Sequence, residues 1–270
     1  MSNLNDKLAA LKGRYLERDD ESDPNGRIYR DKVSGEIYHS VTRILGATAP
    51  PEQQEALAKW LERPGSFQTR EMAAARGTAA HSSAEYVLKL AQRLSRGAAK
   101  KRNGWKMGED GLYRAPKALT KWSLEKAVQS APRVPWSATG YARGLRGWIL
   151  DHVTAIHAVE FSAFHPAGFA GAADGLLDID GVGPCVIDWK TSQKSNHKSN
   201  ESQLFNYRAQ LGAYSLMLNY RTGIQAQGGF VVVARRTGAP TVEQLDLDEL
   251  KKQEDLFLER CATYFMHLPV

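Results

Sequence analysis

The sequence predicts a mixed α/β fold in which helices flank a β-sheet. Apolar residues follow helical spacing in some segments and alternate as in strands in others. The order in the second half is helix, three strands, helix, strand and helix, which excludes a helical bundle and a β-sandwich. The chain has 270 residues, of which 42% are hydrophobic, so we expect a single domain over residues 1–270.

The N-terminal region, residues 25–65, is predicted to form a hairpin followed by a helix. Turn residues surround two short strand-like segments, around Ile28-Tyr29 and Ile37-Tyr38. Pro50-Pro51 then precedes a helix predicted over 52–63, because proline suits the first turn of a helix.

A second helix is predicted from Ser66, as its N-cap, to about residue 94. Gly77 lies inside it and weakens it, and a close approach of another backbone or a ligand would explain a glycine there. Residues 95–140 are rich in Gly, Pro, Lys and Arg. They are interpreted as a loop-rich basic insertion with one helix around 117–130.

The pattern then changes from helix to strands. Residues 141–157 are predicted to be helical, and strand signals follow over 159–164, 168–179 and 184–191. The turn residues Asp180-Gly181-Val182-Gly183 join the last two strands as a hairpin.

The C-terminal part repeats the alternation of helix and strand. A helix is predicted over 204–220, with Gly223 at its C-terminal end. The valine-rich segment 228–235 is expected to be a buried strand. An amphipathic helix over 246–267 completes the chain.

Positive charge is concentrated in one stretch. Residues 86–150 hold 14 Lys and Arg against 3 Asp and Glu, a net charge of +11, whereas the whole chain carries +6. Aromatic rings interleaved with cations suit single-stranded nucleic acid, and this stretch holds Trp105, Trp122, Trp136 and Trp148. The candidate phosphate contacts are Arg96, Lys100, Lys101, Arg102 and Lys106. The alternative remains open that the rings pack against the body and the charges form a solvated face.

Several classes of protein are disfavoured. No apolar run is long enough for a transmembrane helix, and Met1–Arg14 lacks the apolar core of a secretory signal, so a cytoplasmic protein without membrane contact is expected. The two cysteines, Cys185 and Cys261, are expected to be buried thiols. Two cysteines are too few for a four-cysteine cluster, so no iron–sulfur cofactor is expected.

Three residues carry the strongest chemical signal. Asp188 and Lys190 end an apolar strand and point to the same face, because side chains alternate along a strand. Asp174 lies on the preceding strand of the same hairpin, where its carboxylate comes level with Asp188. Two converging carboxylates suit Mg²⁺ or Mn²⁺, and the lysine could hold or deprotonate a water that attacks a phosphate. The alternative is a surface hairpin with an Asp–Lys salt bridge.

Further residues are placed near this centre by their spacing. His81 and Glu85 share one face of the helix that follows residue 66, so His81 is a candidate metal ligand and Glu85 a weaker one. Glu160, on the strand before Asp174, is a candidate outer carboxylate. Gln210 and Tyr214 share a face of the next helix, from which they could reach the lysine or a phosphate. A structural histidine and an ordinary polar helix edge are the competing interpretations.

Together these motifs resemble the RecB-like branch of the PD-(D/E)XK nucleases. The family pattern is a helical His, Gly-x-x-Asp, Asp-x-Lys and Gln-x-x-x-Tyr, matched here in order by the residues His81, Gly171 to Asp174, Asp188 to Lys190, and Gln210 to Tyr214. The resemblance implies a restriction-endonuclease-like core. It also implies that Asp174, Asp188, His81 and the backbone carbonyl of Trp189 bind the metal while Lys190 attends the water.

One subgroup, the mitochondrial genome maintenance exonucleases, is more similar still. The shared features are the run from Ser40 to Leu45, the run Pro51 to Gln54, and the run Val186 to Ser192 with Lys194 downstream. This resemblance implies a single-strand DNA exonuclease that needs Mg²⁺ or Mn²⁺ and a free end. The candidate DNA contacts in these runs are Ser40, Thr42, Arg43 and Thr191.

Three functions are compatible with the sequence. The first is a metal-dependent DNA exonuclease acting on single strands or frayed ends. The second is a structure-specific endonuclease or double-strand exonuclease of the same fold, and the third is a nucleic-acid-binding protein without activity. The sequence holds no helicase motif, so any motor or recombination partner would be a separate protein.

Overall fold

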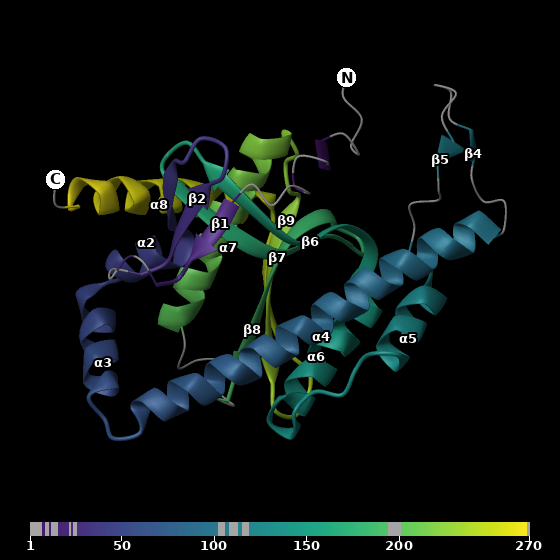
Figure 1. The fold of residues 1–270 in the computed structure, drawn as a ribbon, viewed down its shortest axis with the longest axis horizontal. Helices are drawn as coiled ribbons and strands as arrows, with labels where there is room; N and C mark the ends of the chain where they lie inside the picture. The colour runs from purple at the N-terminus through teal and green to yellow at the C-terminus, as the bar shows by residue number, and fades with distance from the viewer. Residues whose placement is uncertain are drawn as a thin grey trace.

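A computed structural model of the chain describes residues 7–8, 11, 16–21, 23, 26–101, 106–107, 113–114, 119–193 and 201–268. Within them the predicted mixed α/β architecture is confirmed. An eight-stranded mixed sheet runs through the molecule, and helices cover both of its faces (Figure 1). None of the helices in these ranges is long and apolar enough to span a membrane.

Three short strands begin the sheet: β1 (Leu16–Asp19), β2 (Ile28–Asp31) and β3 (Ile37–Ser40). The predicted hairpin is confirmed, since β2 and β3 pair antiparallel, and β3 continues the sheet by pairing parallel to β7. Ser40 ends β3 and accepts a hydrogen bond from the Arg43 amide, which caps a helix that the sequence pattern did not reveal, α2 (Val41–Ala47).

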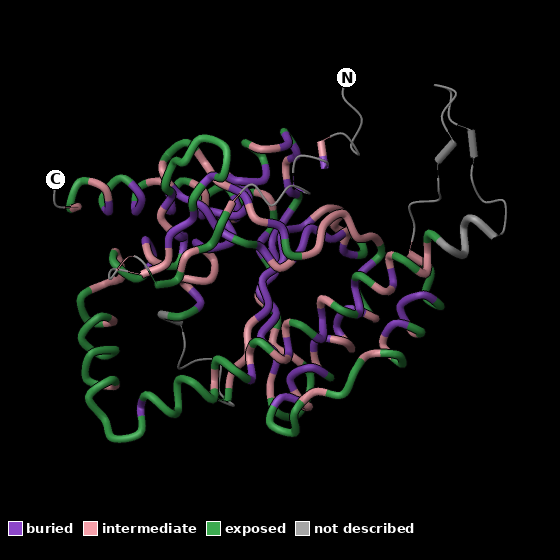
Figure 2. Tube along the Cα trace, in the orientation of Figure 1, coloured by how far each residue is buried: buried purple, intermediate pink, exposed green. Residues whose placement is uncertain are grey.

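Two further helices follow, α3 (Pro51–Leu61) and α4 (Ser66–Lys101). The expected helix after residue 66 is therefore longer than predicted and extends into the supposedly loop-rich insertion. Ser66 is not its cap: the Ser66 hydroxyl donates to the Leu61 carbonyl instead. Figure 2 shows that α3 and the first turns of α4 are largely exposed, and no residue of α3 is buried.

The helix predicted over 141–157 ends earlier than expected. After α5 (Lys121–Gln129), helix α6 covers Thr139–His152 and the next residue begins strand β6 (Val153–His165). The helix ends there because the segment after His152 forms backbone hydrogen bonds with β7 along its whole length, a tertiary contact that the local sequence pattern does not reveal.

The central strands match the prediction closely: β7 (Phe169–Ile179), β8 (Gly183–Ser192) and β9 (Gly228–Arg235). β7 and β8 form the predicted antiparallel hairpin, and β8 pairs parallel with β9. The edge strand β10 (Thr241–Leu245) was not predicted, because it is short and only its last residue is buried. Two further short strands, β4 (Lys106–Met107) and β5 (Tyr113–Arg114), pair with each other.

The last two helices, α7 (Glu201–Thr222) and α8 (Leu247–Met266), pack together on one face of the sheet. Gly223 has a φ of +63° and its amide donates to the Asn219 carbonyl, as expected for a residue that ends a helix. Asp246 caps α8 by accepting from the Glu249 amide.

The sheet separates two hydrophobic cores. Val186 packs in the core beneath α2, α7 and α8, whereas Ile187 and Trp189 pack in the core beneath α4, α5 and α6. The predicted alternation of faces along β8 is therefore confirmed. Cys185 and Cys261 are free, buried thiols in opposite cores.

A buried arginine joins three helices on the α7 side. Arg260 of α8 donates to the Thr48 hydroxyl at 2.9 Å, to the Leu45 carbonyl at 2.6 Å and to the Asn206 side-chain oxygen at 2.9 Å. Asn206 donates in turn to the Gln53 side chain at 3.3 Å, which links α7 to α3. This network fixes the first turns of α7, just before the candidate residue Gln210.

Two glycines of α6 provide a matched test of close packing. A Cβ at Gly140 would lie 1.7 Å from the Arg236 carbonyl oxygen, whereas a Cβ at Gly147 would meet nothing within 4 Å. We expect Gly140→Ala to lower the free energy of unfolding by about 2 kcal/mol or more, because backbone must move. Gly147→Ala should raise it by about 0.5–1 kcal/mol through helix propensity. Urea unfolding measures both, and equal effects would contradict this packing.

Candidate functional site

The candidate site lies at the fork of the sheet, which is the point where β7 and β8 stop pairing and separate. The β7–β8 ladder runs from Ile179 opposite Gly183 to Gly175 opposite Ile187, which brings Asp174 level with Asp188. There the Asp174 carboxylate accepts the Trp189 amide hydrogen at 2.7 Å. A side chain of β7 thus satisfies an amide of β8 just beyond the last backbone pair of the β7–β8 ladder, and from there β8 pairs with β9 alone.

Asp188 and Lys190 form a buried ion pair beyond the fork. The Asp188 Oδ2 lies 2.6 Å from the Lys190 Nζ, and their side chains are 4% and 21% exposed. Lys190 also donates to the Gln210 Oε1 at 3.1 Å, and the Gln210 amide donates to the Tyr214 hydroxyl at 2.5 Å. The structure therefore connects the two residue pairs that sequence spacing had placed near the centre.

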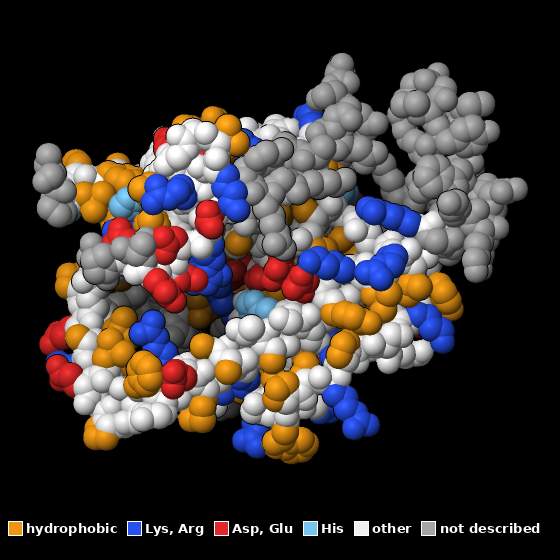
Figure 3. Space-filling view, in the orientation of Figure 1, with side chains coloured by type: hydrophobic (Ala, Val, Ile, Leu, Met, Phe, Trp, Pro, Cys, Tyr) orange, Lys and Arg blue, Asp and Glu red, His pale blue; other side chains and the backbone are white. Residues whose placement is uncertain are grey.

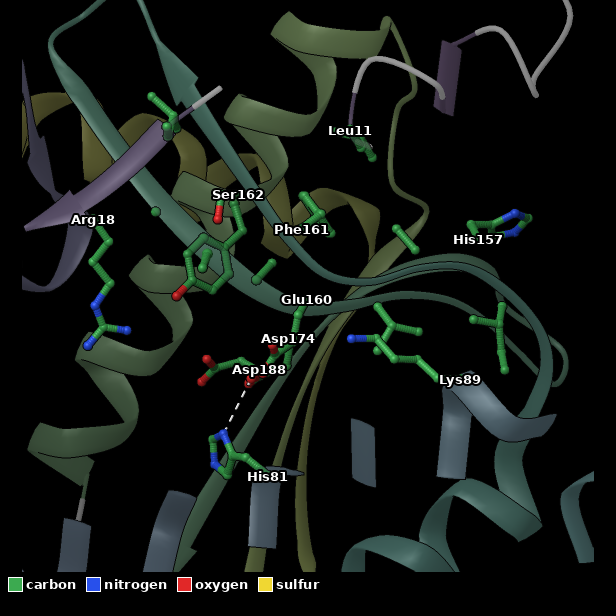
Figure 4. A pocket seen from close by; sticks show the side chains of 18 of the residues that line it. Leu11, Arg18, His81, Lys89, His157, Glu160, Phe161, Ser162, Asp174 and Asp188 are labelled. Atoms are coloured by element: carbon green, nitrogen blue, oxygen red, sulfur yellow. Dashed lines mark ion pairs between the residues drawn. The ribbon is translucent and has the colours of Figure 1, made fainter. Parts of the chain in front are cut away.

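His81 reaches the same point from α4. Its Nδ1 lies 3.3 Å from the Asp174 Oδ1, and Figure 4 shows the imidazole directed at the two aspartates. The contact depends on α4 crossing the fork, a position that brings Gly77 close to Thr191. A Cβ at Gly77 would lie at an ordinary distance of 3.5 Å from the Thr191 hydroxyl, so this approach does not itself require glycine.

The charges at the site depend on one another. Burial raises the pKa of Asp188. The charge of Lys190 lowers this pKa, and the charge of Asp174 raises it further. Burial is the largest influence on Lys190 and would lower its pKa, but Asp188, Tyr207 and Asp174 together outweigh burial and the net pKa is raised. In the same way, Asp174 overcomes the effect of burial and raises the pKa of His81. The centre therefore favours a positive charge between its carboxylates.

Gly171, the first residue of the Gly-x-x-Asp motif, has a packing role. A Cβ there would lie 3.0 Å from the Tyr214 ring and 3.2 Å from both Met217 and Val41. Glycine lets α7 approach β7 closely, and this approach brings Gln210 within reach of Lys190.

Glu160 has an unusual backbone. It is the one residue other than glycine with a positive φ, +48°, among those that the structure describes. Its neighbours pair with β7 on either side of Asp174, and Val159 and Phe161 pack in opposite cores although a regular strand would place them on one face. The left-handed residue is where β6 changes faces, at the level of the site. Such strain is often found at functional sites.

The two outer carboxylates predicted from sequence lie beside the centre. Burial raises the pKa of Glu160, as do the charges of Glu85 and Asp174. Glu85 is paired with Lys89 one turn along α4. Within the described ranges no three His, Cys, Asp or Glu side chains are grouped closely enough to hold a metal ion. His81 and Asp174 contact each other directly instead.

A groove of about 1690 Å³ opens over the fork. It runs along β6 from the β1–β2 hairpin to the second half of α4, and the space-filling view shows acidic, basic and histidine side chains gathered around its hollow (Figure 3). Cations line it on both sides of the aspartates: Arg18, Arg27, Lys32, Lys89, Arg96 and Lys190.

The predicted DNA contacts divide between the groove and the interior. Ser40 and Thr42 line the groove, as does Arg96. Arg43 is paired with Asp23 at 2.8 Å and its side chain is only 5% exposed, so it ties α2 to the preceding loop.

The tryptophans of the basic stretch also divide. Trp136 and Trp122 are 86% and 51% exposed. Trp148 is buried and contacts Trp189, so this ring packs against the body of the protein, which is the alternative that the sequence had left open. Trp105 and Arg102 lie outside the described residues, as do the side chains of Lys100, Lys101 and Lys106.

Sequence reasoning missed one residue of the centre. Tyr207 places its ring 5.0 Å from the Lys190 Nζ, one turn before Gln210 on α7. Its spacing from Gln210 and Tyr214, at i, i+3 and i+7 on one helix face, was the signal available to find it.

Comparison with known proteins agrees with this geometry. The model of the PD-(D/E)XK nuclease superfamily matches residues 52–265, most of the chain and all of the residues at the fork. The chain belongs to this superfamily. The superfamily fold accounts for the mixed sheet flanked by helices, and the family predicted from the motifs is confirmed.

Three individual proteins are similar to the chain at 13–33% identity. Mouse mitochondrial genome maintenance exonuclease 1 is 29% identical over 217 residues, which cover 74% of this chain and 51% of the relative. The human protein of that name is 33% identical over 105 residues, 38% of this chain and 29% of the relative. The chain thus spans about half or less of these relatives. A putative exonuclease from Eubacterium rectale has a TM-score of 0.34 at 13% identity, covering 68% of this chain and 66% of that one.

The His81–Asp174 pair should make stability depend on pH in the metal-free protein. Because the folded-state pKa of His81 is raised above its ordinary 6.5, its stabilisation is complete below that value and is lost as pH rises through the folded pKa. In EDTA, the free energy of unfolding should be higher for wild type than for His81→Asn. This difference should be largest at low pH and should shrink as pH rises. Asp174→Asn should remove the same pH dependence. A gap that widens with pH would contradict the assignment.

Proposed function

We propose that this chain is a metal-dependent deoxyribonuclease that hydrolyses phosphodiester bonds, acting as an exonuclease on single strands or frayed ends. The observation that carries this proposal is the convergence of Asp174, Asp188 and Lys190 at the fork of the sheet. Membership of a nuclease superfamily and similarity to proteins named as exonucleases support it.

The kinds of donor atom at the fork suit a hard divalent cation, although His81 and Asp174 contact each other in this structure and the side chains are not gathered around one point. The buried Asp188 Oδ2 accepts no well-formed hydrogen bond, although Lys190 neutralises it, and a second carboxylate and an imidazole stand beside it. Oxygen-rich sets of this kind suit Mg²⁺ or Mn²⁺. The residues that would hold the ion are Asp174, Asp188 and His81, with the Trp189 carbonyl, and Glu85 or Glu160 further out. When bound, the ion would supply Lewis-acid polarisation of the phosphodiester and acidify a water.

The chain's own residues perform the remaining tasks. The Lys190 ammonium, held by Asp188 and Gln210, orients the attacking water and neutralises charge that builds on the phosphate. Gln210 is itself fixed by Tyr214, whose burial raises its pKa and keeps the hydroxyl protonated. Attack in line on phosphorus leaves a 5′-phosphate.

Two features support a single-stranded DNA substrate. The exposed rings of Trp122 and Trp136 are available for stacking on unpaired bases, which is worth about 1–3 kcal/mol per base. The cations along the groove suit a phosphate backbone that passes over the aspartates.

Digestion of end-labelled linear and circular single-stranded DNA tests the proposed function. With Mg²⁺ or Mn²⁺ the linear strand should be degraded and the circle spared, and EDTA should stop the reaction. Cutting of the circle would replace the exonuclease with an endonuclease. Binding of both strands without cutting would instead favour the non-catalytic alternative.

The lysine assignment has its own test. Lys190→Ala should lower the cleavage rate by about a hundredfold or more, since it removes the group that attends the water, while DNA binding persists. Lys252→Ala is the control, because this residue of α8 is 72% exposed and distant from the groove. Full activity in Lys190→Ala, with wild-type behaviour of the control, would contradict the role given to Lys190.

A further inference from the structure

Tyr207 makes a contact with the reactive lysine that the family motif does not include. Its ring centroid lies 5.0 Å from the Lys190 Nζ, within the range of a cation–π interaction. The ring is partly buried against the core beneath α7 and α8, so its orientation is fixed by packing. Tyr207 thus presents a rigid face to a flexible cation.

The lysine needs such a contact because its side chain is long. Asp188 attracts the ammonium at 2.6 Å and Gln210 accepts from it at 3.1 Å, yet the Lys190 side chain remains 21% exposed. A lysine side chain has many rotamers, and fixing it costs conformational entropy that each contact must offset. The aromatic ring is a third contact to the ammonium, beside these two polar partners.

We propose that Tyr207 is a positioning residue, which holds Lys190 in its reactive orientation through the face of its ring. It acts through Lys190 and touches neither water nor phosphate, and this inference rests on the proposed nuclease function. The ring, rather than the hydroxyl, carries the effect. Tyr207 therefore extends the Gln210–Tyr214 face of α7 by one turn.

Two substitutions at Tyr207 separate ring from hydroxyl. Tyr207→Leu should lower kcat for the linear strand by about tenfold with little change in KM, whereas Tyr207→Phe should keep kcat within about twofold of wild type. Tyr220→Leu is the matched control: it is the same substitution on the same helix, at a ring that is 52% exposed and contacts Phe164 and His165.

A second readout does not depend on activity. Labelling with an amine-reactive acylating reagent in EDTA at one fixed pH, followed by mass spectrometry of the peptide that contains Lys190, reports how readily the reagent reaches its side-chain nitrogen in the deprotonated form. Labelling of Lys190 should be faster in Tyr207→Leu than in wild type, and unchanged in Tyr207→Phe and Tyr220→Leu. A purely structural role of the tyrosine would raise labelling at many lysines together.

Several outcomes would overturn the inference. These are an unchanged kcat in Tyr207→Leu, an effect on KM alone, equal losses in the Phe and Leu variants, or unchanged labelling of Lys190. If the wild-type protein cleaves no nucleic acid, the proposed function falls and the inference with it. If wild type cleaves and Tyr207→Leu matches it in both measurements, only the inference falls.

Discussion

The hydrogen bond from the Trp189 amide to the Asp174 carboxylate is the interaction on which the site depends. It lies at the point where β7 and β8 stop exchanging backbone bonds, and it places two carboxylates level on neighbouring strands. A buried amide without a partner costs about 1–3 kcal/mol, so the aspartate contributes to the fold as well as to the proposed metal site. The Asp188–Lys190 pair, buried beyond it, is possible because the fork leaves space for α7 to supply Gln210.

The surrounding structure serves to hold α4 and α7 against this fork. Gly171 lets Tyr214 of α7 approach β7, and the Arg260 network fixes α7 to its neighbours. On the other side, α4 brings His81 to Asp174. The result is a cluster of opposite charges in which each group shifts the pKa of the others. The candidate groups come from four separate elements, α4, β7, β8 and α7, so their mutual effects depend on the tertiary structure.

The backbone of β6 adds a constraint of another kind. Glu160 holds a left-handed conformation opposite Asp174, and strain of this type costs about 1–3 kcal/mol. It persists because Val159 and Phe161 are each committed to a different core. The residues around this change of face line the groove, where cations lie on both sides of the aspartates.

The sequence by itself determined the strands that build the hairpin and the alternation of side chains between the two faces of the sheet along β8. It also identified the candidate site residues Asp174, Asp188, Lys190, Gln210 and Tyr214. These follow from local periodicity and turn residues, which act over a few positions. Only the tertiary structure decided where α4 ends, that the segment after His152 joins the sheet, that Arg43 is committed to Asp23, and that Tyr207 faces Lys190. Each of these depends on contacts between residues distant in the chain. Helical spacing could place Tyr207 on the face of Gln210 and Tyr214, but it could not show that this face meets Lys190.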